Sequence, residues 1–499
     1  MPIIIKEIKK TLGGSMRKKI LFSICMLMAL TLLVNAAPKE KQVLPASLTD
    51  TEKEFIQNNY DQYINSKTTR NAERLPQGNF WGPAEFEPAD EVIFSWNGYS
   101  TFLKQLIKFT ADGGKAWVVA DNGWYNTVDS VKRELEDYGV NTDNVRMIEY
   151  GLNSVWMRDF GPWFIYTEDG DREIIDFKYN RPRPLDDRFP EKVAELLEIQ
   201  NNQTNLIMPG GNFILDGHDV AILTDVVFNP AQGGMPNLSV DELKDYLKKL
   251  FNVKKVILLE QMKRDGTGHV DMFCKLLNDT TFIVGEYATP SDGADDNYYI
   301  LNRNAEKLAH ETNGNGEPFK VVRIPMPKYD GTSYSYTNSL IYNKKVLVPI
   351  YGFSTDEEAL NIYRQILPGY DVRGFDARNI ITANGAIHCI TKMVMADPLK
   401  IEAAPITETR AGQETTINFK VDSTREREYN KVAVYYSDNP EGPFAEVMAN
   451  ETEDGYAANI PSMRAGTTVY YFIQAESDNM YETFPEDAPE RGISTFVVR

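Results

Sequence analysis

Apolar residues recur at helical spacing in several stretches between about residues 125 and 390, and each stretch is followed by a short strand rich in β-branched residues. The clearest helix begins at Ser239, which forms a capping box with Glu242. The strand 255–260 comes next. We predict similar helices near residues 128–138, 190–200, 295–312 and 355–367, and similar strands near 145–150, 204–208, 321–326 and 371–376.

This alternation predicts five units of roughly 50 residues, a length typical of one supersecondary repeat. A single unit cannot bury its apolar face, so we expect the five to stack or to close into a ring. The loops of the five units are, in chain order, 156–159 (Trp-Met-Arg-Asp), 210–212 (Gly-Gly-Asn), 268–271 (Gly-His-Val-Asp), 336–338 (Tyr-Thr-Asn) and 385–389 (Gly-Ala-Ile-His-Cys). Closure would bring these polar loops together at one end of the ring.

The pattern changes after about residue 398, where short alternating strands replace the helices. We predict strands at 415–421, 431–437, 455–460, 468–474 and 494–498. About 100 residues of this kind are typical of a β-sandwich similar to immunoglobulin-like modules. The stretch contains no histidine or cysteine, so we assign it no catalytic role. We therefore expect a catalytic α/β domain over residues 45–397 and an all-β domain over residues 398–499.

The N-terminus has the three parts of a secretory signal peptide, namely the basic residues 17–19, the apolar run 20–34 and the small residues Ala36 and Ala37. We expect residues 1–37 to be removed, with Met16 as an alternative start of translation. An uncleaved membrane anchor is the competing interpretation, but the apolar run is short for a membrane span. The mature protein is expected to be secreted or periplasmic, without a membrane span.

Charge narrows the range of partners. The whole chain carries a net charge of −19, and residues 1–37 hold six basic residues and one acidic residue, so the mature chain would carry −24. Such a surface repels nucleic acid and attracts cationic ligands. The same acidity is equally consistent with a role in solubility alone.

Two cysteines remain after the leader, which contains Cys25. In an exported protein, Cys274 and Cys389 could form one disulfide. Their surroundings favour a different interpretation. Cys389 follows the small residues Gly385 and Ala386 in a polar loop, whereas Cys274 lies among apolar residues and is expected to be an inert core thiol.

Two acids are suited to binding a large cation. Asp159 is flanked by aromatic residues, where an uncompensated charge would be costly. Asp271 lies two positions from His269, and the two side chains share a face if this segment is a strand. A guanidinium group requires carboxylates of this kind, because it is planar, charged and carries five N–H donors. An ion pair between Arg158 and Asp159 is the alternative interpretation.

The chain has only four histidines, and His269 is the preferred general acid and base. His388 is adjacent to Cys389, and neighbours on a strand face opposite ways, so we interpret His388 as structural. We interpret His218 as a turn residue and His310 as a surface helix residue.

From about residue 82 to residue 394, the chain resembles the agmatine deiminase and Porphyromonas-type peptidylarginine deiminase family. The segments that carry this resemblance are VWMRDFGPWF, NRPRPLDDRFP, GGNFILDG, GHVDMF, YTNSL and GAIHCIT. The resemblance implies a pentein fold, in which five ββαβ modules surround a central site. The expected fold class is thus an α/β propeller of five modules, followed by the all-β immunoglobulin-like domain.

The resemblance also implies a role for each candidate residue. Asp159 and Asp271 would hold the guanidinium group, His269 would be the general acid and base, and Cys389 would be the nucleophile. Asn338 would occupy the assisting polar position. No metal or other cofactor is implied for the chemistry. A Cys389 thiolate would attack the guanidinium carbon and form a covalent thiouronium, which water then hydrolyses.

The expected substrate depends on Arg181 and Arg183, which lie in a stiff Arg-Pro-Arg-Pro loop. We expect these two guanidinium groups, together with Trp156, to bind substrate, and specifically the α-carboxylate of a peptide that ends in arginine. Pairing of the two arginines with Asp186 and Asp187 is the alternative.

Three rival functions remain. An exported agmatine deiminase is favoured by residues 265–268 (Asp-Gly-Thr-Gly), which look more like the agmatine enzymes. A catalytically inactive adhesin would use only the C-terminal domain. A cysteine protease would lack an evident oxyanion-hole motif. The expected partners are arginine-containing peptides or proteins and not nucleic acid, while nothing in the sequence indicates the oligomeric state.

Overall fold

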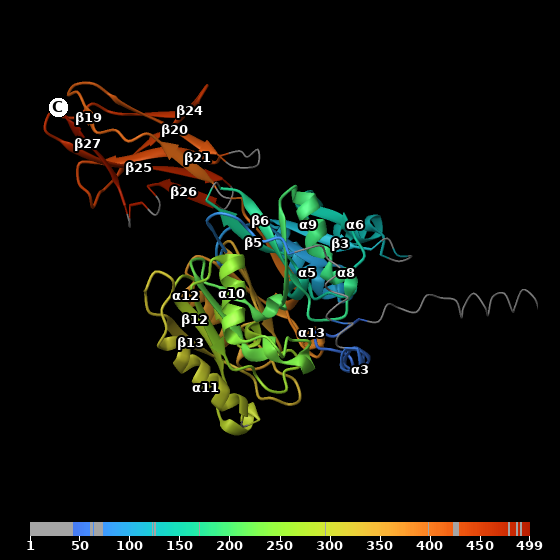
Figure 1. Cartoon of the computed structure of the whole chain (residues 1–499). Coiled ribbons are helices and arrows are strands. Elements are labelled where there is room, and N and C mark those ends of the chain that lie inside the picture. Colours follow the sequence, from blue (N-terminus) through green and yellow to red (C-terminus); the bar gives the residue numbers. More distant parts are fainter. Residues whose placement is uncertain are drawn as a thin grey trace, which may run out of the picture. The chain divides into compact units, whose positions relative to one another are not determined.

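The structure is a computed structural model, drawn in Figure 1. It describes residues 43–59, 63, 73–121, 123, 126–168, 170–294, 296–397, 399–422, 429–477, 480–485, 488–489 and 492–499. The chain divides after Val43, and the described residues from Leu44 onward belong to one compact unit. The predicted leader, residues 1–37, lies outside the described residues. Within the described ranges, no helix is long and apolar enough to cross a membrane.

Five small sheets share one plan between residues 80 and 395 of the described chain. In each sheet an antiparallel strand pair is extended by a parallel strand, which the chain reaches through a crossover helix. Four sheets use strands that are close in sequence: β5 (Trp163–Thr167), β6 (Arg172–Lys178) and β7 (Asn201–Ile207), with β1 (Phe80–Trp81) at the edge; β8 (Ile214–Leu215), β9 (Val220–Thr224) and β10 (Lys255–Leu259); β11 (Cys274–Leu276), β12 (Thr281–Glu286) and β13 (Lys320–Pro325); β14 (Leu340–Tyr342), β15 (Lys345–Ile350) and β16 (Asp371–Asp376).

The fifth sheet joins the two ends of this region. Its strands are β17 (Thr391–Met395), β2 (Ala89–Ser95), β3 (Lys115–Ala120) and β4 (Val145–Glu149). Strand β17 pairs antiparallel with β2, so that Thr391 lies opposite Phe94. The strand that directly follows Cys389 is therefore fixed to a strand almost 300 positions earlier.

The crossover helices agree with the predicted apolar spacing. They are α6 (Val128–Asp137), α9 (Phe189–Leu197), α10 (Val240–Phe251), α11 (Asp296–Ala309) and α12 (Asp356–Ile366). The predicted capping box of α10 is confirmed, because the Glu242 N–H donates to Ser239 Oγ at 3.2 Å and the Ser239 N–H donates to the Glu242 carboxylate at 2.8 Å. Figure 1 labels these helices around the sheets that contain β3, β6 and β12.

The first crossover helix of this region was not predicted. Helix α5 (Ser100–Ala111) connects β2 to β3, so the repeated plan begins before residue 125. The residue before α5, Tyr99, has a positive φ of 55° and offers no side-chain cap. The start of this helix therefore lacks the Ser, Thr, Asp or Asn signal by which an N-terminus is recognised in a sequence.

Short helices occupy the loops between these elements. They are η1 (Thr142–Asn144), α7 (Met157–Phe160), α8 (Pro184–Asp187), η2 (Gly210–Asn212), η3 (Asp225–Phe228), η4 (Pro230–Gln232), η5 (Val270–Met272), η6 (Pro290–Gly293), α13 (Arg378–Ile381) and η7 (His388–Ile390). The strand assumed for residues 269–271 and for residues 388–389 is therefore wrong, because both segments begin a turn of 3₁₀ helix.

The first described residues form an N-terminal segment, which we define as residues 44–58. It consists of an extended stretch and helix α3 (Asp50–Asn58), whose Thr49 and Glu52 form a second capping box. Leu48 and Ile56 of this segment share a small apolar cluster with Tyr63 and Ile207.

The C-terminal residues have a hydrophobic core of their own, to which Ile401, Ile417, Val432 and Ile473 contribute. One sheet contains β18 (Lys400–Ala403), β20 (Thr415–Asp422), β24 (Gly455–Ile460) and β23 (Asn450–Thr452); the other contains β19 (Glu408–Thr409), β27 (Ser494–Val498), β25 (Thr468–Ser477), β21 (Lys431–Ser437), β22 (Ala445–Met448) and β26 (Met480–Phe484). The five predicted strands are among them, and the region is all-β as expected.

Candidate active site

Four loops meet in the interior and together supply five buried polar side chains. Asp159 comes from α7, His269 and Asp271 from the start of η5, Asn338 from the loop before β14, and Cys389 from η7. Each of these side chains is at most 3% exposed. The structure thus brings together all five residues that the sequence singled out for catalysis.

Gly211 in η2 marks the point on which three of these side chains converge. A Cβ atom at this position would lie 2.7 Å from Nδ1 of His269, 2.9 Å from Oδ1 of Asp159 and 3.0 Å from Oδ2 of Asp271. Glycine therefore leaves space that any other residue would fill. The neighbouring Gly210 meets backbone instead, because its Cβ would lie 2.1 Å from the carbonyl oxygen of Arg158.

Several buried atoms around this point have no hydrogen-bond partner among the described residues. They are both carboxylate oxygens of Asp159, both ring nitrogens of His269 and Oδ1 of Asp271. Within this set, Nδ1 of His269 lies 3.5 Å from Oδ1 of Asp159. Buried polar groups are rarely left unpaired, so this arrangement is suited to a ligand that donates several hydrogen bonds.

Asn338 holds the cysteine loop in place. Its Oδ1 accepts the N–H of Ala386 at 3.0 Å and the N–H of Cys389 at 3.3 Å, while its Nδ2 donates to Sγ of Cys389 at 3.1 Å. The same sulfur lies 3.7 Å from Oδ2 of Asp271. A Cβ at Gly385 would be 3.1 Å from the sulfur, so this glycine also leaves room beside the thiol.

Burial shifts the ionisation of the site. Burial, reinforced by Asp271, raises the pKa of Asp159 to about 7. Burial lowers the pKa of His269 to about 3. Burial and the two neighbouring carboxylates raise the pKa of the Cys389 thiol well above its usual range. A positive charge placed between the two carboxylates would act in the opposite direction and lower the pKa values of Asp159 and of the Cys389 thiol.

Glu85 and His388 belong to the same neighbourhood, although sequence reasoning gave them no place there. Nδ1 of His388 lies 2.7 Å from Oδ2 of Asp271, and its Nε2 lies 2.5 Å from Oε2 of Glu85. Arg158 pairs with Glu85 at 3.5 Å and not with Asp159 as the alternative interpretation had it. The only signal for Glu85 in the sequence was its position in residues 82–88, where the family resemblance begins.

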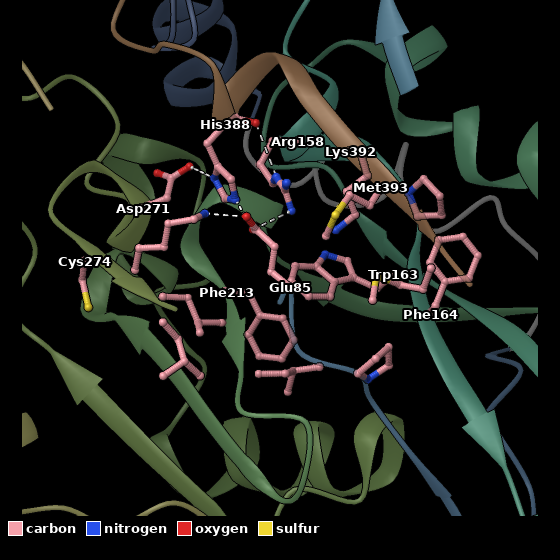
Figure 2. A pocket seen from close by; sticks show the side chains of 17 residues that line it. Glu85, Arg158, Trp163, Phe164, Phe213, Asp271, Cys274, His388, Lys392 and Met393 are labelled. Carbon is pink, nitrogen blue, oxygen red and sulfur yellow. Dashed lines mark hydrogen bonds and ion pairs between the residues drawn. The ribbon is translucent and has the colours of Figure 1, made fainter. Parts of the chain in front are cut away.

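A cavity of about 40 Å³ lies beside Glu85, Arg158 and His388. Figure 2 shows Glu85, Arg158, His388 and Asp271 on one side of it and the aromatic rings of Trp163, Phe164 and Phe213 on the other. Its lining does not include Cys389, His269 or Asp159. It holds about one or two water molecules by volume, so it is not the space that an arginine side chain would enter.

The three residues predicted to bind substrate lie under the N-terminal segment. Arg183 forms a bidentate pair with Glu52, at 2.8 and 3.2 Å, and not with Asp186 or Asp187 as the alternative had it. Nε of Arg181 donates to the carbonyl of Ala46 at 3.0 Å. The indole N–H of Trp156 donates to the carbonyl of Leu44 at 2.7 Å. In this structure all three side chains are therefore bonded to the chain itself.

The remaining candidates are placed as follows. Cys274 is buried on β11, where burial raises the pKa of its thiol. Cys274 and Cys389 are both free, so the disulfide alternative is wrong. His218 lies in the turn between β8 and β9, as predicted, and His310 lies just beyond the end of α11. Within the described ranges, no three His, Cys, Asp or Glu side chains are grouped so as to hold a metal ion.

Comparison with known proteins gives consistent results. A family model described as Porphyromonas-type peptidyl-arginine deiminase matches residues 82–394. A Latilactobacillus sakei protein named "Putative agmatine deiminase" is 28% identical over 290 residues, which is 51% of this chain and 78% of that protein. A Photobacterium profundum protein of the same name is 26% identical over 359 residues, which is 64% of this chain and 96% of that protein.

Solved structures are similar over the same region. The agmatine deiminase of Enterococcus faecalis superposes with a TM-score of 0.57 at 22% identity, covering 64% of this chain and 99% of that one. A Porphyromonas gingivalis structure described as a "Putative Arginine Deiminase" gives a TM-score of 0.56 at 23% identity, covering 63% of this chain and 98% of that one. The mixed α/β fold described above is thus the fold of these deiminase structures.

Proposed function

Because the chain belongs to the Porphyromonas-type peptidyl-arginine deiminase family, we propose that it converts arginine at a peptide C-terminus into citrulline and ammonia. Members of this family and its agmatine relatives are hydrolases that act on the C–N bonds of linear amidines.

One observation carries the proposal. Asp159, Asp271 and His269 present unpaired acceptor atoms around the space at Gly211, next to the sulfur of Cys389. A guanidinium group supplies the planar set of N–H donors and the positive charge that these atoms lack. Neither an adhesin nor a cysteine protease requires two buried carboxylates beside its thiol.

The first half of the reaction forms a covalent intermediate. The bound cation offsets the two carboxylates and favours the thiolate form of Cys389, whose thiol proton passes to His269. The sulfur attacks the guanidinium carbon, and a C–S bond forms. His269 then returns a proton to one terminal nitrogen, the C–N bond breaks, and ammonia leaves. The product is a thiouronium cation on Cys389.

The second half hydrolyses this intermediate. His269, now neutral, takes a proton from a water molecule that attacks the same carbon. The C–S bond breaks, the ureido product is released and Cys389 regains its thiol. Asp159 and Asp271 remain ionised throughout and hold the two ends of the planar group.

Arg181 and Arg183 support a substrate that carries a carboxylate at some distance from its guanidinium group. Arg183 already binds one carboxylate with two hydrogen bonds, that of Glu52, so its side chain is placed for such recognition. The α-carboxylate of a C-terminal arginine is the corresponding group on a peptide. Agmatine has no carboxylate to offer.

Agmatine itself is the second candidate substrate. The relatives from Latilactobacillus sakei and Photobacterium profundum are both named for it. The Enterococcus faecalis structure is also that of an agmatine deiminase. The family membership alone supports the two substrates equally.

We also propose a domain organisation and a cellular location for the protein. We infer that the five sheets are the modules of a pentein propeller over residues 45–397, and that residues 398–499 are an immunoglobulin-like domain. We also infer that residues 1–37 direct export to the periplasm or beyond. Sequencing the N-terminus of protein from the medium or envelope tests export, and an intact Met1 or Met16 there would contradict it.

Three substrates at matched concentration separate the alternatives: a peptide ending in free arginine, the same peptide amidated, and agmatine. We expect the free-acid peptide to exceed both others in kcat/KM by at least about tenfold, since a charge-assisted hydrogen bond to a carboxylate contributes about 1.5–3 kcal/mol. Ureido product would be measured by colorimetry. Equal or faster turnover of agmatine would replace the peptidyl-arginine proposal by the agmatine one.

A further inference from the structure

Two side chains that the proposed mechanism does not use, Glu85 and His388, are connected directly to Asp271. The imidazole of His388 bridges two carboxylates, with 2.7 Å from Nδ1 to Asp271 and 2.5 Å from Nε2 to Glu85 (Figure 2). Both partners are acceptors when they are ionised. Both contacts are therefore hydrogen bonds only if one additional proton is shared within the group.

Glu85 is held as an anion in the interior. Nζ of Lys275 lies 2.5 Å from its Oε1, Nη1 of Arg158 lies 3.5 Å from its Oε2, and the backbone N–H of Ile341 donates to Oε1 at 3.3 Å. Although burial acts in the opposite direction, the neighbouring positive charges hold the pKa of Glu85 well below its usual range. A fixed anion on Nε2 of His388 keeps a proton on that nitrogen and orients the ring.

The ring in turn determines how Asp271 faces the site. Oδ2 of Asp271 is occupied by His388, whereas Oδ1 has no hydrogen-bond partner among the described residues. A carboxylate that binds one edge of a guanidinium group must lie in the plane of that group. Small rotations of this carboxylate would therefore weaken both binding and the approach of the reacting carbon to Cys389.

We propose that Glu85 is a positioning residue that acts through His388 to fix the carboxylate of Asp271. The purely structural role that the sequence indicated for His388 is replaced by a role in the site. This inference rests on the proposed function, in which Asp271 binds the guanidinium group. It assigns no chemical step to Glu85 or His388.

A double-mutant cycle with Glu85→Gln and His388→Asn tests the connection. Asparagine at 388 can still donate to Asp271 from the position of Nδ1, but it cannot reach Glu85. We expect each single variant to lose about 10- to 100-fold in kcat/KM with a rise in KM, and the double variant to lose no more than His388→Asn alone. Glu87→Gln is the matched control, since Glu87 is on the same turn and its carboxylate accepts from Ala84.

Three outcomes would overturn the proposal: a Glu85→Gln enzyme within twofold of wild type, losses that multiply in the double variant, or losses matched by Glu87→Gln. Proton NMR gives a readout that does not need turnover. A far-downfield resonance from the short His388–Glu85 bond should be present in the wild type and absent in Glu85→Gln, and its absence from the wild type would also overturn the proposal. A wild-type enzyme inactive on every guanidine substrate would contradict the proposed function instead.

An independent observation concerns the N-terminal segment, residues 44–58. Its backbone carbonyls accept from Trp156, Arg181 and Arg183, and the Ala46 N–H donates to the carbonyl of Ala383 at 2.9 Å. Trp156 packs against Gly385, because a Cβ there would lie 2.6 Å from its ring and 3.1 Å from the sulfur of Cys389. The segment thus covers the side chain that borders the thiol.

The segment also supplies a carboxylate to the residue expected to bind one. Glu52 holds Arg183 with two hydrogen bonds, and the carbonyl of Pro45 accepts from the same guanidinium group at 2.8 Å. Ala46 is completely buried, and each catalytic candidate is at most 3% exposed. A peptide carboxylate could reach Arg183 only by displacing Glu52.

The geometry points to an autoinhibitory role, in which residues 44–58 occupy the subsite for the C-terminal carboxylate of the peptide and must withdraw before it binds. This second inference also rests on the proposed function. It predicts that a peptide ending in free arginine competes with the segment, whereas a substrate without a carboxylate does not compete for Arg183.

Glu52→Gln tests this role without removing the segment, because glutamine can keep the capping box with Thr49. We expect KM for the free-acid peptide to fall at least about fivefold with kcat within twofold, which corresponds to loss of a competing interaction. Glu54→Gln, an exposed residue of the same helix, is the control and should leave KM unchanged. A raised KM or a reduced kcat for Glu52→Gln would show instead that the segment is part of the working site.

Hydrogen exchange separates this inference from the proposed function. In a Cys389→Ala enzyme, the peptide ending in free arginine should accelerate exchange of the Ala46 amide, and its amidated form should not. Unchanged exchange with bound free-acid peptide would overturn the autoinhibitory role. Failure of the wild type to process that peptide at all would contradict the proposed substrate.

Discussion

At the residue scale, the free site holds its thiol and its imidazole in neutral form. Burial and two carboxylates keep the Cys389 thiol protonated, and burial keeps the His269 ring unprotonated at neutral pH. In the proposed mechanism, the Cys389 thiolate therefore forms only when the guanidinium cation is bound. This dependence protects an otherwise reactive thiol from other electrophiles.

Replacing the nucleophile should abolish turnover. We expect Cys389→Ala to lower kcat by about 10⁴-fold or more, as loss of a covalent nucleophile usually does. Cys274→Ser is the matched control, because Cys274 is a buried thiol on β11 and should keep substantial activity if the variant folds. Stopped assays of ureido product measure both, and a near-normal rate for Cys389→Ala would end the covalent mechanism.

The pH dependence follows from Asp159. This residue must be ionised to bind the cation, and its pKa is raised to about 7 by burial and by Asp271. Since a raised carboxylate pKa leaves the group protonated below that pH, kcat/KM should fall as the pH drops below about 7. In the complex the bound cation lowers the same pKa, so kcat should fall only at more acidic pH. Coincident acid limbs for the two parameters would contradict this assignment.

At the scale of elements, every catalytic side chain sits in a short loop or helical turn at the end of a strand or next to one. The η2 turn, residues 210–212, differs from these segments because glycine lies closest to the other candidate residues. It brings backbone, and no side chain, up to His269, Asp159 and Asp271. The space in which we propose that substrate binds thus depends on the absence of a Cβ at Gly211.

Filling that space gives a prediction for one element. The Gly211→Ala variant should fold with little loss of thermal stability, since the added methyl group contacts only the ends of side chains. Its kcat/KM should nevertheless fall by about 100-fold or more, because the methyl group occupies the space proposed for the guanidinium group. Gly210→Ala should instead destabilise the fold, as its Cβ meets the backbone of Arg158. Thermal melts and kinetic assays of both variants test these expectations. An active Gly211→Ala enzyme would show that the substrate binds elsewhere.

At the scale of the whole molecule, the deiminase sheets and the C-terminal strands use different hydrophobic cores. The two large clusters of the catalytic region contain no residue beyond Met395, and the C-terminal cluster contains none before Ile401. All candidate catalytic residues belong to the first region. We therefore expect the C-terminal sheets to contribute no group to the chemistry.

This separation predicts the effect of truncation. A chain that ends after Asp397 should keep kcat and KM within about threefold of the full-length values, because Arg172 and Tyr166 retain their contacts with Met395 and Ala396. Both proteins would be assayed with the same arginine substrate. A truncated chain that stays folded by circular dichroism but loses activity would show that the C-terminal sheets support the site.

The sequence by itself determined the local elements and the polar loops of this protein. Helices α9 to α12 and their following strands were predicted because apolar periodicity is a property of neighbouring residues on one element. Asp159, His269, Asp271 and Cys389 were identified because they are chemically unusual residues in loops that the repeated units were expected to bring together, whereas Asn338 was identified from the family resemblance. What they catalyse could be inferred from their chemistry and the family resemblance.

Only the tertiary structure decided which distant groups became partners. The pairing of β17 with β2, the bridge from Glu85 through His388 to Asp271, and the bond between Glu52 and Arg183 each join positions more than 100 residues apart. The periodicity of the sequence does not predict which acid pairs with which base, because the chain offers many acids to each basic residue. The choice depends on which side chains the packed sheets bring within hydrogen-bond distance, where burial makes an unpaired charge too costly to leave.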